Sequence, residues 1–180
     1  MKFCSACGSD RLALTVPAGD NRPRYVCGQC HTIHYQNPKI VAGCLPLFGE
    51  QVLLCKRAIE PRRGYWNVPS GYLENGETVE AGAAREVHEE AVARVRDLRL
   101  HTVYSIPHIN QVYLHFLAEL VDGAFAVGPE SLECRLFAEA DIPWSDIAFS
   151  SSVYSLRRYF EDRQAGRART HVGTYENLLG

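Results

Sequence analysis

Three glutamates in one short stretch of the chain are spaced so that they could bind a divalent cation. Glu86, Glu89 and Glu90 stand at positions i, i+3 and i+4, which in a helix places them on one face, within an arc of roughly 100°. Carboxylates this close repel one another, and their pKa values rise unless a cation neutralises them. Clustered hard oxygen ligands suit Mg²⁺ or Mn²⁺. The spacing alone fits a metal site and a solvated acidic helix face equally well.

Four of the seven cysteines form two matched pairs that suit a structural zinc site. Cys4 and Cys7 form one Cys-x-x-Cys pair, and Cys27 and Cys30 form the other. Two such turns can present four thiolates to one tetrahedral Zn²⁺. Because four thiolates fill the zinc coordination shell, no position remains open for a substrate. We therefore expect this zinc to stabilise structure and to take no part in chemistry.

The glutamates lie in a segment whose composition predicts a helix. Residues 78–94 contain no proline and are rich in alanine, glutamate and arginine, which are strong helix formers. Thr78 can cap the start of this helix. An apolar stripe that would face a core recurs every four residues, at Val79, Ala83, Val87 and Ala91.

The chain is expected to consist of a small zinc ribbon, a main domain and a tail. Residues 1–36 hold the paired cysteines and are too few to fold on burial alone, so metal binding would supply the missing free energy. Asn37-Pro38 then interrupts the chain. The main domain is expected over 37–165, and residues 166–180 are expected to form a loose, peripheral tail.

Within the main domain, alternating and apolar runs predict several strands and a second helix. The final helix is expected over 150–163, with Val153, Leu156 and Phe160 on one face. An order of two strands, a helix, further strands and a last helix indicates an α/β or α+β fold. The predicted strands are 40–48, 51–57, 98–106, 111–121 and 134–138.

Composition and charge narrow the class of protein. The 180 residues carry 19 Lys and Arg against 21 Asp and Glu, a net charge of −2, which argues against nucleic acid as the main partner. The sequence lacks an apolar run long enough to cross a membrane, and its first ten residues lack the apolar stretch of a signal peptide. We therefore expect a soluble cytoplasmic protein with no membrane partner.

The glutamate segment resembles the Nudix box, which reads Gly, five residues, Glu, seven residues, Arg-Glu, an apolar residue, any residue and Glu-Glu. The upstream runs VLLCKR, GYW and VPSG are also similar to that family, and the resemblance covers most of residues 37–165. It implies an α+β fold, the Nudix α/β/α sandwich with a mixed sheet, preceded here by the small zinc ribbon. The matching positions are Gly71, Glu77, Arg85, Glu86, Val87, Glu89 and Glu90.

One departure from the family pattern concerns the end of the predicted helix. The family usually has a glycine followed by an apolar residue there, whereas this chain has Val92 and Ala93. A glycine at that position normally ends a helix in a left-handed turn. Its absence predicts that the helix ends differently or runs slightly longer.

The resemblance also implies the chemistry. Nudix hydrolases cleave a diphosphate linkage attached to a nucleoside, using water and divalent cations. The resemblance assigns Glu86, Glu89 and Glu90 as ligands of Mg²⁺ or Mn²⁺, with a carbonyl near Gly71 completing the metal site. It further implies that Arg85 pairs with Glu77 and braces the loop against the helix.

The general base remains open at this stage, because family members differ. Glu86 is one candidate, and Glu133, in the stretch ESLECRLF, is the other. An exposed loop glutamate is an equally good interpretation of Glu133.

A zinc ribbon ahead of a Nudix domain resembles two subgroups. The first, the NADH diphosphatases, includes enzymes that remove NAD caps from RNA, and its Ser-Gln-Pro-Trp-Pro-Phe-Pro run is absent here. The second acts on ADP-ribose or FAD and tends to carry a proline past the box, where this chain has Pro107. We therefore expect hydrolysis of ADP-ribose to AMP and ribose 5-phosphate, or of FAD, with NADH diphosphatase or NAD-decapping activity as the alternative.

Aromatic and basic side chains could hold the adenine of such a substrate. Of these we predict Arg62 and Tyr104 as substrate-binding residues. Family resemblance also implies a homodimer. The rival hypothesis is a nucleotide-sensing module without catalysis, which the intact glutamate cluster argues against. The full set of candidate adenine-binding residues is Arg62, Tyr65, Trp66, Tyr72, Tyr104 and His108.

Overall fold

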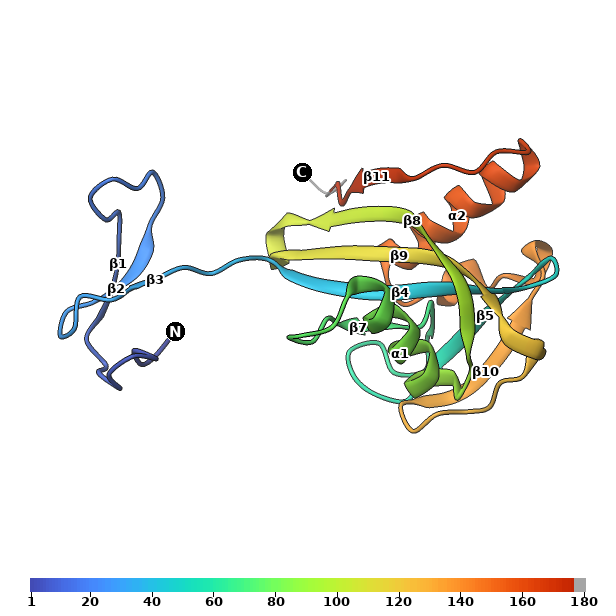
Figure 1. The fold of residues 1–180 in the computed structure, drawn as a ribbon, viewed down its shortest axis with the longest axis horizontal. Helices are drawn as coiled ribbons and strands as arrows, with labels where there is room; N and C mark the ends of the chain where they lie inside the picture. Colours follow the sequence, from blue (N-terminus) through green and yellow to red (C-terminus); the bar gives the residue numbers. More distant parts are fainter. Residues whose placement is uncertain (177–180) are drawn as a thin grey trace. The chain divides into compact units, whose positions relative to one another are not determined.

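The computed structural model describes residues 1–176 and divides the chain into two compact units, Met1–Asn37 and Pro38–Gly180 (Figure 1). No helix among residues 1–176 combines the length and the apolar character that a membrane span needs. Residues 177–180 of the predicted tail lie outside the described part of the chain.

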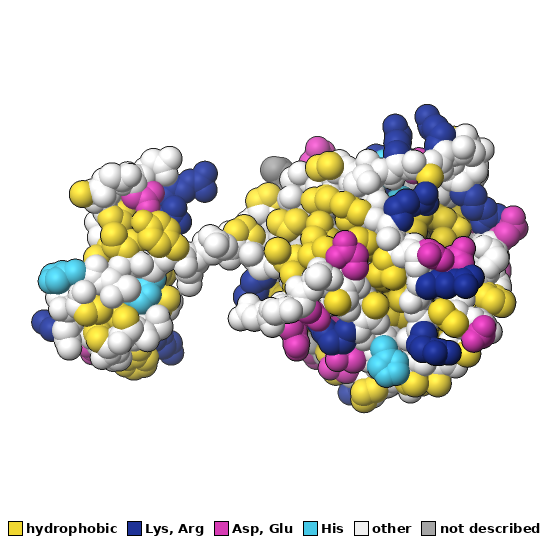
Figure 2. Space-filling model, viewed as in Figure 1, with side chains coloured by type: hydrophobic (Ala, Val, Ile, Leu, Met, Phe, Trp, Pro, Cys, Tyr) yellow, Lys and Arg dark blue, Asp and Glu magenta, His cyan; other side chains and the backbone are white. Residues whose placement is uncertain are grey.

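The N-terminal unit is a three-stranded antiparallel sheet that carries the four paired cysteines. Its strands are β1 (Leu12–Thr15), β2 (Arg24–Cys27) and β3 (Ile33–His34), in the order β1-β2-β3. Large apolar side chains such as Phe3 and Tyr35 stay exposed, and Figure 2 shows apolar surface over this unit. A unit that buries so little apolar area needs a metal to stabilise it.

The second unit is built on a mixed sheet in the order β10-β5-β4-β9-β8-β11 (Figure 1). β4 pairs with β9 and β8 with β11 in parallel, while the other neighbours are antiparallel. Two short strands join at the side, β6 on β5 and β7 on β4. The strand bounds are β4 (Lys39–Phe48), β5 (Gln51–Arg57), β6 (Trp66–Asn67), β7 (Ser70–Tyr72), β8 (Val95–Ile106), β9 (Gln111–Leu120), β10 (Ser131–Phe137) and β11 (His171–Thr174).

Two α-helices cover opposite faces of this sheet. Alternate residues of one strand point to opposite faces, and Cys44 of β4 packs with α1 (Val79–Ala91) whereas Leu45 packs with α2 (Ser150–Gln164). A mixed sheet between two helices agrees with the predicted α+β sandwich. Short 3-10 helices complete the unit: η1 (Pro107–Ile109), η2 (Val121–Gly123), η3 (Glu139–Asp141) and η4 (Trp144–Asp146).

The first helix begins as predicted, but its end differs from the prediction. Thr78 caps it by accepting a hydrogen bond from the Ala81 amide at 3.2 Å. The helix ends at Ala91, and Val92 adopts the left-handed conformation (φ 48°) that the family usually gives to glycine. This conformation costs a β-branched residue about 1–2 kcal/mol.

The loop before β10 helps to hold the strained turn at Val92. Gly128 donates its N–H to the carbonyl of Glu90 at 3.0 Å, and Ala126 donates to the carbonyl of Ala91 at 2.8 Å. These bonds satisfy carbonyls that a helix end otherwise leaves unpaired. A Cβ at Gly128 would lie 1.9 Å from the carbonyl oxygen of Glu89, so only glycine allows the loop to approach so closely.

The C-terminal segment that we expected to be loose contributes a strand to the sheet. Residues 171–174 form β11, which pairs in parallel with β8. His171 is buried and hydrogen-bonded to Asp162 of α2 at 2.8 Å, and Tyr175 donates its N–H to the carbonyl of Ser105. The prediction of a peripheral tail was therefore wrong for these residues, because a run of four residues carries too little pattern to identify a strand.

Candidate active site

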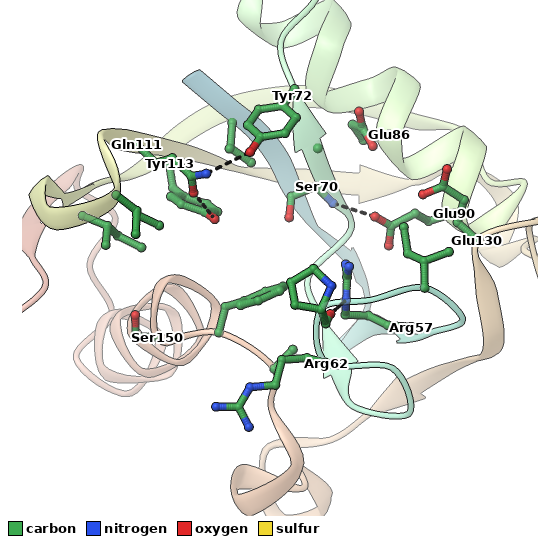
Figure 3. A pocket seen from close by; sticks show the side chains of 18 of the residues that line it. Arg57, Arg62, Ser70, Tyr72, Glu86, Glu90, Gln111, Tyr113, Glu130 and Ser150 are labelled. Atoms are coloured by element: carbon green, nitrogen blue, oxygen red, sulfur yellow. Dashed lines mark hydrogen bonds between the residues drawn. The ribbon is translucent and has the colours of Figure 1, made fainter. Parts of the chain in front are cut away.

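A cleft of about 980 Å³ opens in the second unit, and the glutamate helix lines one of its walls (Figure 3). The opposite part of the cleft is lined by apolar and aromatic side chains from η1, β9 and the start of α2. The cleft therefore joins an acidic half to an aromatic half. Its acidic residues are Glu74, Glu86, Glu89, Glu90 and Glu130, together with Glu60 from the loop between β5 and β6.

The three predicted metal ligands all lie on the acidic wall, but in different environments. Glu86 and Glu90 are buried, whereas the side chain of Glu89 is half exposed. Burial raises the pKa of Glu86, Arg85 opposes the shift, and the charges of Glu89 and Glu130 add to it. Burial also raises the pKa of Glu90, to about 8, although a hydrogen bond from the Ser70 amide opposes the shift. A cation beside these groups would offset this cost.

Arg85 ties the acidic wall to the loop that precedes the helix. Its guanidinium donates to both carboxylate oxygens of Glu77, at 3.1 and 2.9 Å, and to the carbonyl of Tyr72 at 3.1 Å. One further nitrogen, Nη1, donates to Glu86 at 2.7 Å and to Glu89 at 2.9 Å. The hydrogen bonds to Glu77 are the largest cause that raises the Arg85 pKa. Arg85 thus supplies positive charge between two of the predicted ligands.

Gly71 leaves room for the glutamates to face the cleft. A Cβ on Gly71 would lie 2.4 Å from Oε1 and 2.5 Å from Oε2 of Glu86. The closely approached backbone and the buried carboxylates form an oxygen-rich hollow of the kind that Mg²⁺ or Mn²⁺ requires. The residues present therefore fit a divalent cation.

The four ribbon cysteines converge as expected for one zinc ion. Their sulfur atoms lie within 4.8 Å of one another, and the pairs Cys4–Cys30 and Cys7–Cys27 are each 3.6 Å apart. Four sulfurs at about 2.3 Å from one tetrahedral Zn²⁺ would be about 3.8 Å apart. His34 hydrogen-bonds to Cys4 Sγ at 3.3 Å, so it lies behind a ligand, and the four thiolates remain the fitting donor set.

The structure places Glu133 away from the cleft. It lies on β10 opposite Lys56, 4.0 Å from the lysine amine, and its side chain is half exposed. Glu130, three residues earlier, lines the cleft near Glu90 instead (Figure 3). The turn residues Gly128-Pro129 were the signal in the sequence that the chain reverses here, and they could have directed attention to Glu130.

The two predicted substrate-binding residues separate in the structure. Arg62 lines the cleft, with its guanidinium 5.3 Å from the centre of the Tyr65 ring. Tyr104 is 6 % exposed, stacks on Tyr154 with ring centres 4.9 Å apart, and is not among the cleft residues. Tyr104 points to the sheet face under α2, so its prediction as a substrate-binding residue is corrected.

Sequence reasoning missed Gln111, Tyr113 and Tyr175, which line the cleft beside the predicted candidates Tyr72 and His108. Gln111 bridges two tyrosines, donating to Tyr72 Oη at 2.9 Å and accepting from Tyr113 Oη at 2.9 Å (Figure 3). At the same end, His108 and Tyr175 face each other with ring centres 4.9 Å apart. The missed residues come from β9 and from the segment after β11, which only the fold brings together with η1 and Tyr72.

A mixed sheet between two helices, with a glutamate wall that fits a divalent cation and an aromatic half-cleft, is the arrangement of the Nudix fold. The chain belongs to the Nudix family: the NUDIX domain model matches residues 37–157, and a second model, Nudix N-terminal, matches residues 2–36. Members of this enzyme family use Mg²⁺ or Mn²⁺. The predicted family and fold class are therefore confirmed.

Known proteins show how far this likeness extends. A NUDIX hydrolase from Nitrosomonas europaea, solved by crystallography, is 55 % identical with a TM-score of 0.92, over 97 % of this chain and 99 % of that one. The NAD-capped RNA hydrolase NudC of Salmonella heidelberg (strain SL476) is 30 % identical over 147 residues, 79 % of this chain and 53 % of that protein. The chain thus spans about half the length of the curated relatives it matches.

A more distant structure shows the fold alone. An ADP-ribose pyrophosphatase from Streptococcus suis 89-1591 is 20 % identical with a TM-score of 0.60, over 77 % of this chain and 100 % of that one.

Proposed function

We propose that the chain hydrolyses the diphosphate linkage of ADP-ribose to give AMP and ribose 5-phosphate, with FAD as a second substrate. The observation that carries this proposal is the single cleft that joins a glutamate wall to an aromatic half. A dinucleotide-type molecule has the same division, because a charged diphosphate is flanked by an aromatic base and a sugar. A small molecule in such a cleft can place its diphosphate at the glutamates and its base at the tyrosines.

The glutamate wall would hold the catalytic cations. Glu86, Glu89 and Glu90 are the proposed ligands, with a carbonyl near Gly71. A bound Mg²⁺ or Mn²⁺ would neutralise the diphosphate and lower the pKa of a bound water. The Arg85–Glu77 pair acts as a positioning element: it fixes the loop between β7 and α1 against the helix, and Arg85 also holds the carbonyl of Tyr72, next to Gly71.

The chain's own basic and acidic groups would orient the substrate and take up a proton. Arg57 and Arg62 both line the cleft, where a guanidinium can pair with phosphate oxygens in a forked geometry. Glu86 remains a candidate general base. Glu130 replaces Glu133 as the second candidate, because it lines the cleft and Glu133 does not. A base must lie within hydrogen-bond reach of the proton that it removes.

The aromatic half would bind the adenine. A base that stacks on an aromatic side chain gains about 1–3 kcal/mol in nucleic-acid complexes. Tyr72 and Tyr113 are held in place by their shared hydrogen-bond partner Gln111, and a fixed ring loses little entropy on binding. His108 and Tyr175 offer a second stacking surface.

A second candidate function is hydrolysis of NADH or of NAD caps on RNA. The 30 % identity to a NAD-capped RNA hydrolase over 147 residues favours it, although the chain lacks the Ser-Gln-Pro-Trp-Pro-Phe-Pro run. We also propose that the protein is a cytoplasmic homodimer that acts on small molecules in preference to RNA.

A substrate panel tests these proposals. Purified chain with Mg²⁺ is given ADP-ribose, FAD, NADH and NAD-capped RNA. AMP release is measured for the three small molecules, and release of nicotinamide mononucleotide is measured for NAD-capped RNA, because its adenosine stays on the RNA. We expect the highest kcat/KM with ADP-ribose. The highest value with NADH or NAD-capped RNA would favour the second function, and no turnover of any compound would favour a nucleotide sensor. The variant Glu89→Gln tests the role of the glutamate wall in this turnover. Its control is Glu80→Gln, because Glu80 is an exposed glutamate on the same helix.

A further inference from the structure

A second set of metal-ligating side chains lies beneath α2, on the sheet face opposite α1. His101 of β8, Asp162 of α2 and His171 of β11 each offer one ligand atom, and these atoms lie within 4.8 Å of one another. The three residues are only 1 %, 5 % and 7 % exposed. Among residues 1–176, the ribbon cysteines form the other group that converges in this way. A metal ion shared by the three residues would offset part of the desolvation cost that their burial carries.

His101 is oriented as a metal-ligating histidine would be. Its Nε2 lies 3.1 Å from the backbone carbonyl of Ser155. Because a carbonyl can only accept, Nε2 carries the proton, and in neutral imidazole the lone pair then lies on Nδ1. Histidines that bind metals usually donate their other ring N–H to a carbonyl or carboxylate, which fixes the ring.

Asp162 holds an oxygen that lacks a hydrogen-bond partner. Its Oδ2 accepts from His171 Nε2 at 2.8 Å, but its buried Oδ1 has no hydrogen bond within the described residues. Arg169 Nε lies 3.6 Å from Oδ1, beyond hydrogen-bond distance, and the arginine side chain is 57 % exposed. A buried carboxylate oxygen without a hydrogen bond is costly, and its ion pair with Arg169 at 3.6 Å shows that a cation suits this position.

The separation of the two imidazole rings is compatible with their binding one ion. Their centres are 5.5 Å apart and their planes are 77° from each other. A metal ion at about 2.1 Å from a ring nitrogen is about 3.2 Å from the ring centre, so two rings at a tetrahedral angle have centres about 5.2 Å apart. The observed separation differs from this by a few tenths of an ångström.

We propose that His101, Asp162 and His171 form a binding site for a single Zn²⁺ or a similar borderline divalent metal, separate from both the ribbon and the glutamate wall. Two imidazole nitrogens and one carboxylate oxygen are a common zinc donor set, and water completes the coordination. The ion clamps β11 to α2 and β8. It thereby holds Tyr175, one residue past β11, in its place at the cleft. This site does not depend on which substrate the cleft accepts.

Cobalt binding to the full-length chain tests the proposal. The chain is kept with its ribbon zinc and an excess of Mg²⁺, Co²⁺ is added, and visible absorption and metal content per chain are measured. The wild type should bind one Co²⁺ more than Asp162→Asn or His171→Gln. His88→Gln, an exposed histidine of α1, should behave as the wild type. Equal Co²⁺ content and spectra in all four proteins would overturn the proposal and leave a hydrogen-bonded Asp162–His171 pair.

A second measurement avoids variants that fail to fold. Crystals of the wild type grown with Zn²⁺ are measured at the zinc absorption edge, and the ribbon cysteines provide the internal positive control. The proposal predicts an anomalous peak between His101, Asp162 and His171 as well as the ribbon peak. A ribbon peak without the second peak would overturn it.

Discussion

Replacing Gly71 with alanine should displace a metal-binding carboxylate without unfolding the protein. The new Cβ would lie 2.4 Å from Glu86 Oε1, whereas ordinary contacts begin at 3.4 Å, so the carboxylate must move by about 1 Å. Arg85 holds the same oxygen from another side at 2.7 Å, and the displacement therefore disturbs that ion pair as well.

The size of the effect on catalysis follows from this displacement. A shift of about 1 Å in a catalytic group costs on the order of 100-fold in rate, or about 2.7 kcal/mol of transition-state stabilisation. The cost to folding should be small, because the group that moves is the end of a flexible side chain. Gly71 lies in β7, where alanine is tolerated and reduces the entropy of the unfolded chain.

The assay measures kcat/KM for AMP release from ADP-ribose across a Mg²⁺ titration, together with the thermal unfolding midpoint. Gly71→Ala should lose about 100-fold in kcat/KM and need more Mg²⁺, with an unchanged midpoint. Gly49→Ala is the control: Gly49 has φ 59°, and a Cβ there would meet no atom of residues 1–176 within 4 Å, so this variant should lose about 1 kcal/mol of stability but no activity. Wild-type kcat/KM and Mg²⁺ dependence in Gly71→Ala would refute the reasoning.

Three further predictions concern separate parts of the chain. Glu89→Gln should lower kcat by about 100-fold or more at an unchanged unfolding midpoint, since the side chain is half exposed; retained turnover would contradict the metal role. Cys7→Ser should remove one zinc per chain and expose residues 1–37 to protease while kcat changes little; unchanged zinc content by mass spectrometry would contradict the ribbon assignment. Burial lowers the pKa of His115 from 6.5 to about 3. As the pH falls, His115 therefore takes up a proton in the unfolded chain at a higher pH than in the folded chain. This group should therefore lower the free energy of unfolding by about 2 kcal/mol between pH 7 and pH 5. Urea titrations at the two pH values measure this drop, and an equal drop in His115→Asn would contradict the prediction.

Local patterns were sufficient to predict the elements that carry the proposed catalytic residues. The four-residue apolar stripe and Thr78 predicted α1 within a few residues, because helix periodicity and capping are set by neighbours in the sequence. The spacing of the ribbon cysteines likewise predicted their convergence. The resemblance to the Nudix box added the assignment of Gly71, Glu77 and Arg85, which spacing alone did not provide.

Features that depend on tertiary contacts could not be predicted from the sequence. The left-handed turn at Val92 is held by the loop before β10, which hydrogen-bonds to the last carbonyls of α1. The residues near Val92 in the sequence do not indicate that this loop packs there. β11 forms by pairing with β8, which lies about seventy residues earlier in the chain, and His171 is hydrogen-bonded to Asp162 of α2. Glu130 lines the cleft from the turn before β10, whereas Glu133 lies within β10 opposite Lys56, and the sequence does not show where this strand begins. Tyr104 is buried because the α2 face of the sheet is covered.

The central claim is that Glu86, Glu89 and Glu90 hold divalent cations beside the diphosphate of the substrate. The most direct measurement is a crystal structure of the chain with Mn²⁺ and a non-hydrolysable ADP-ribose analogue, measured at the manganese absorption edge. We expect anomalous density within bonding distance of these carboxylates, next to the diphosphate of the analogue. Manganese density elsewhere, with the three carboxylates unliganded and the analogue bound, would contradict the claim.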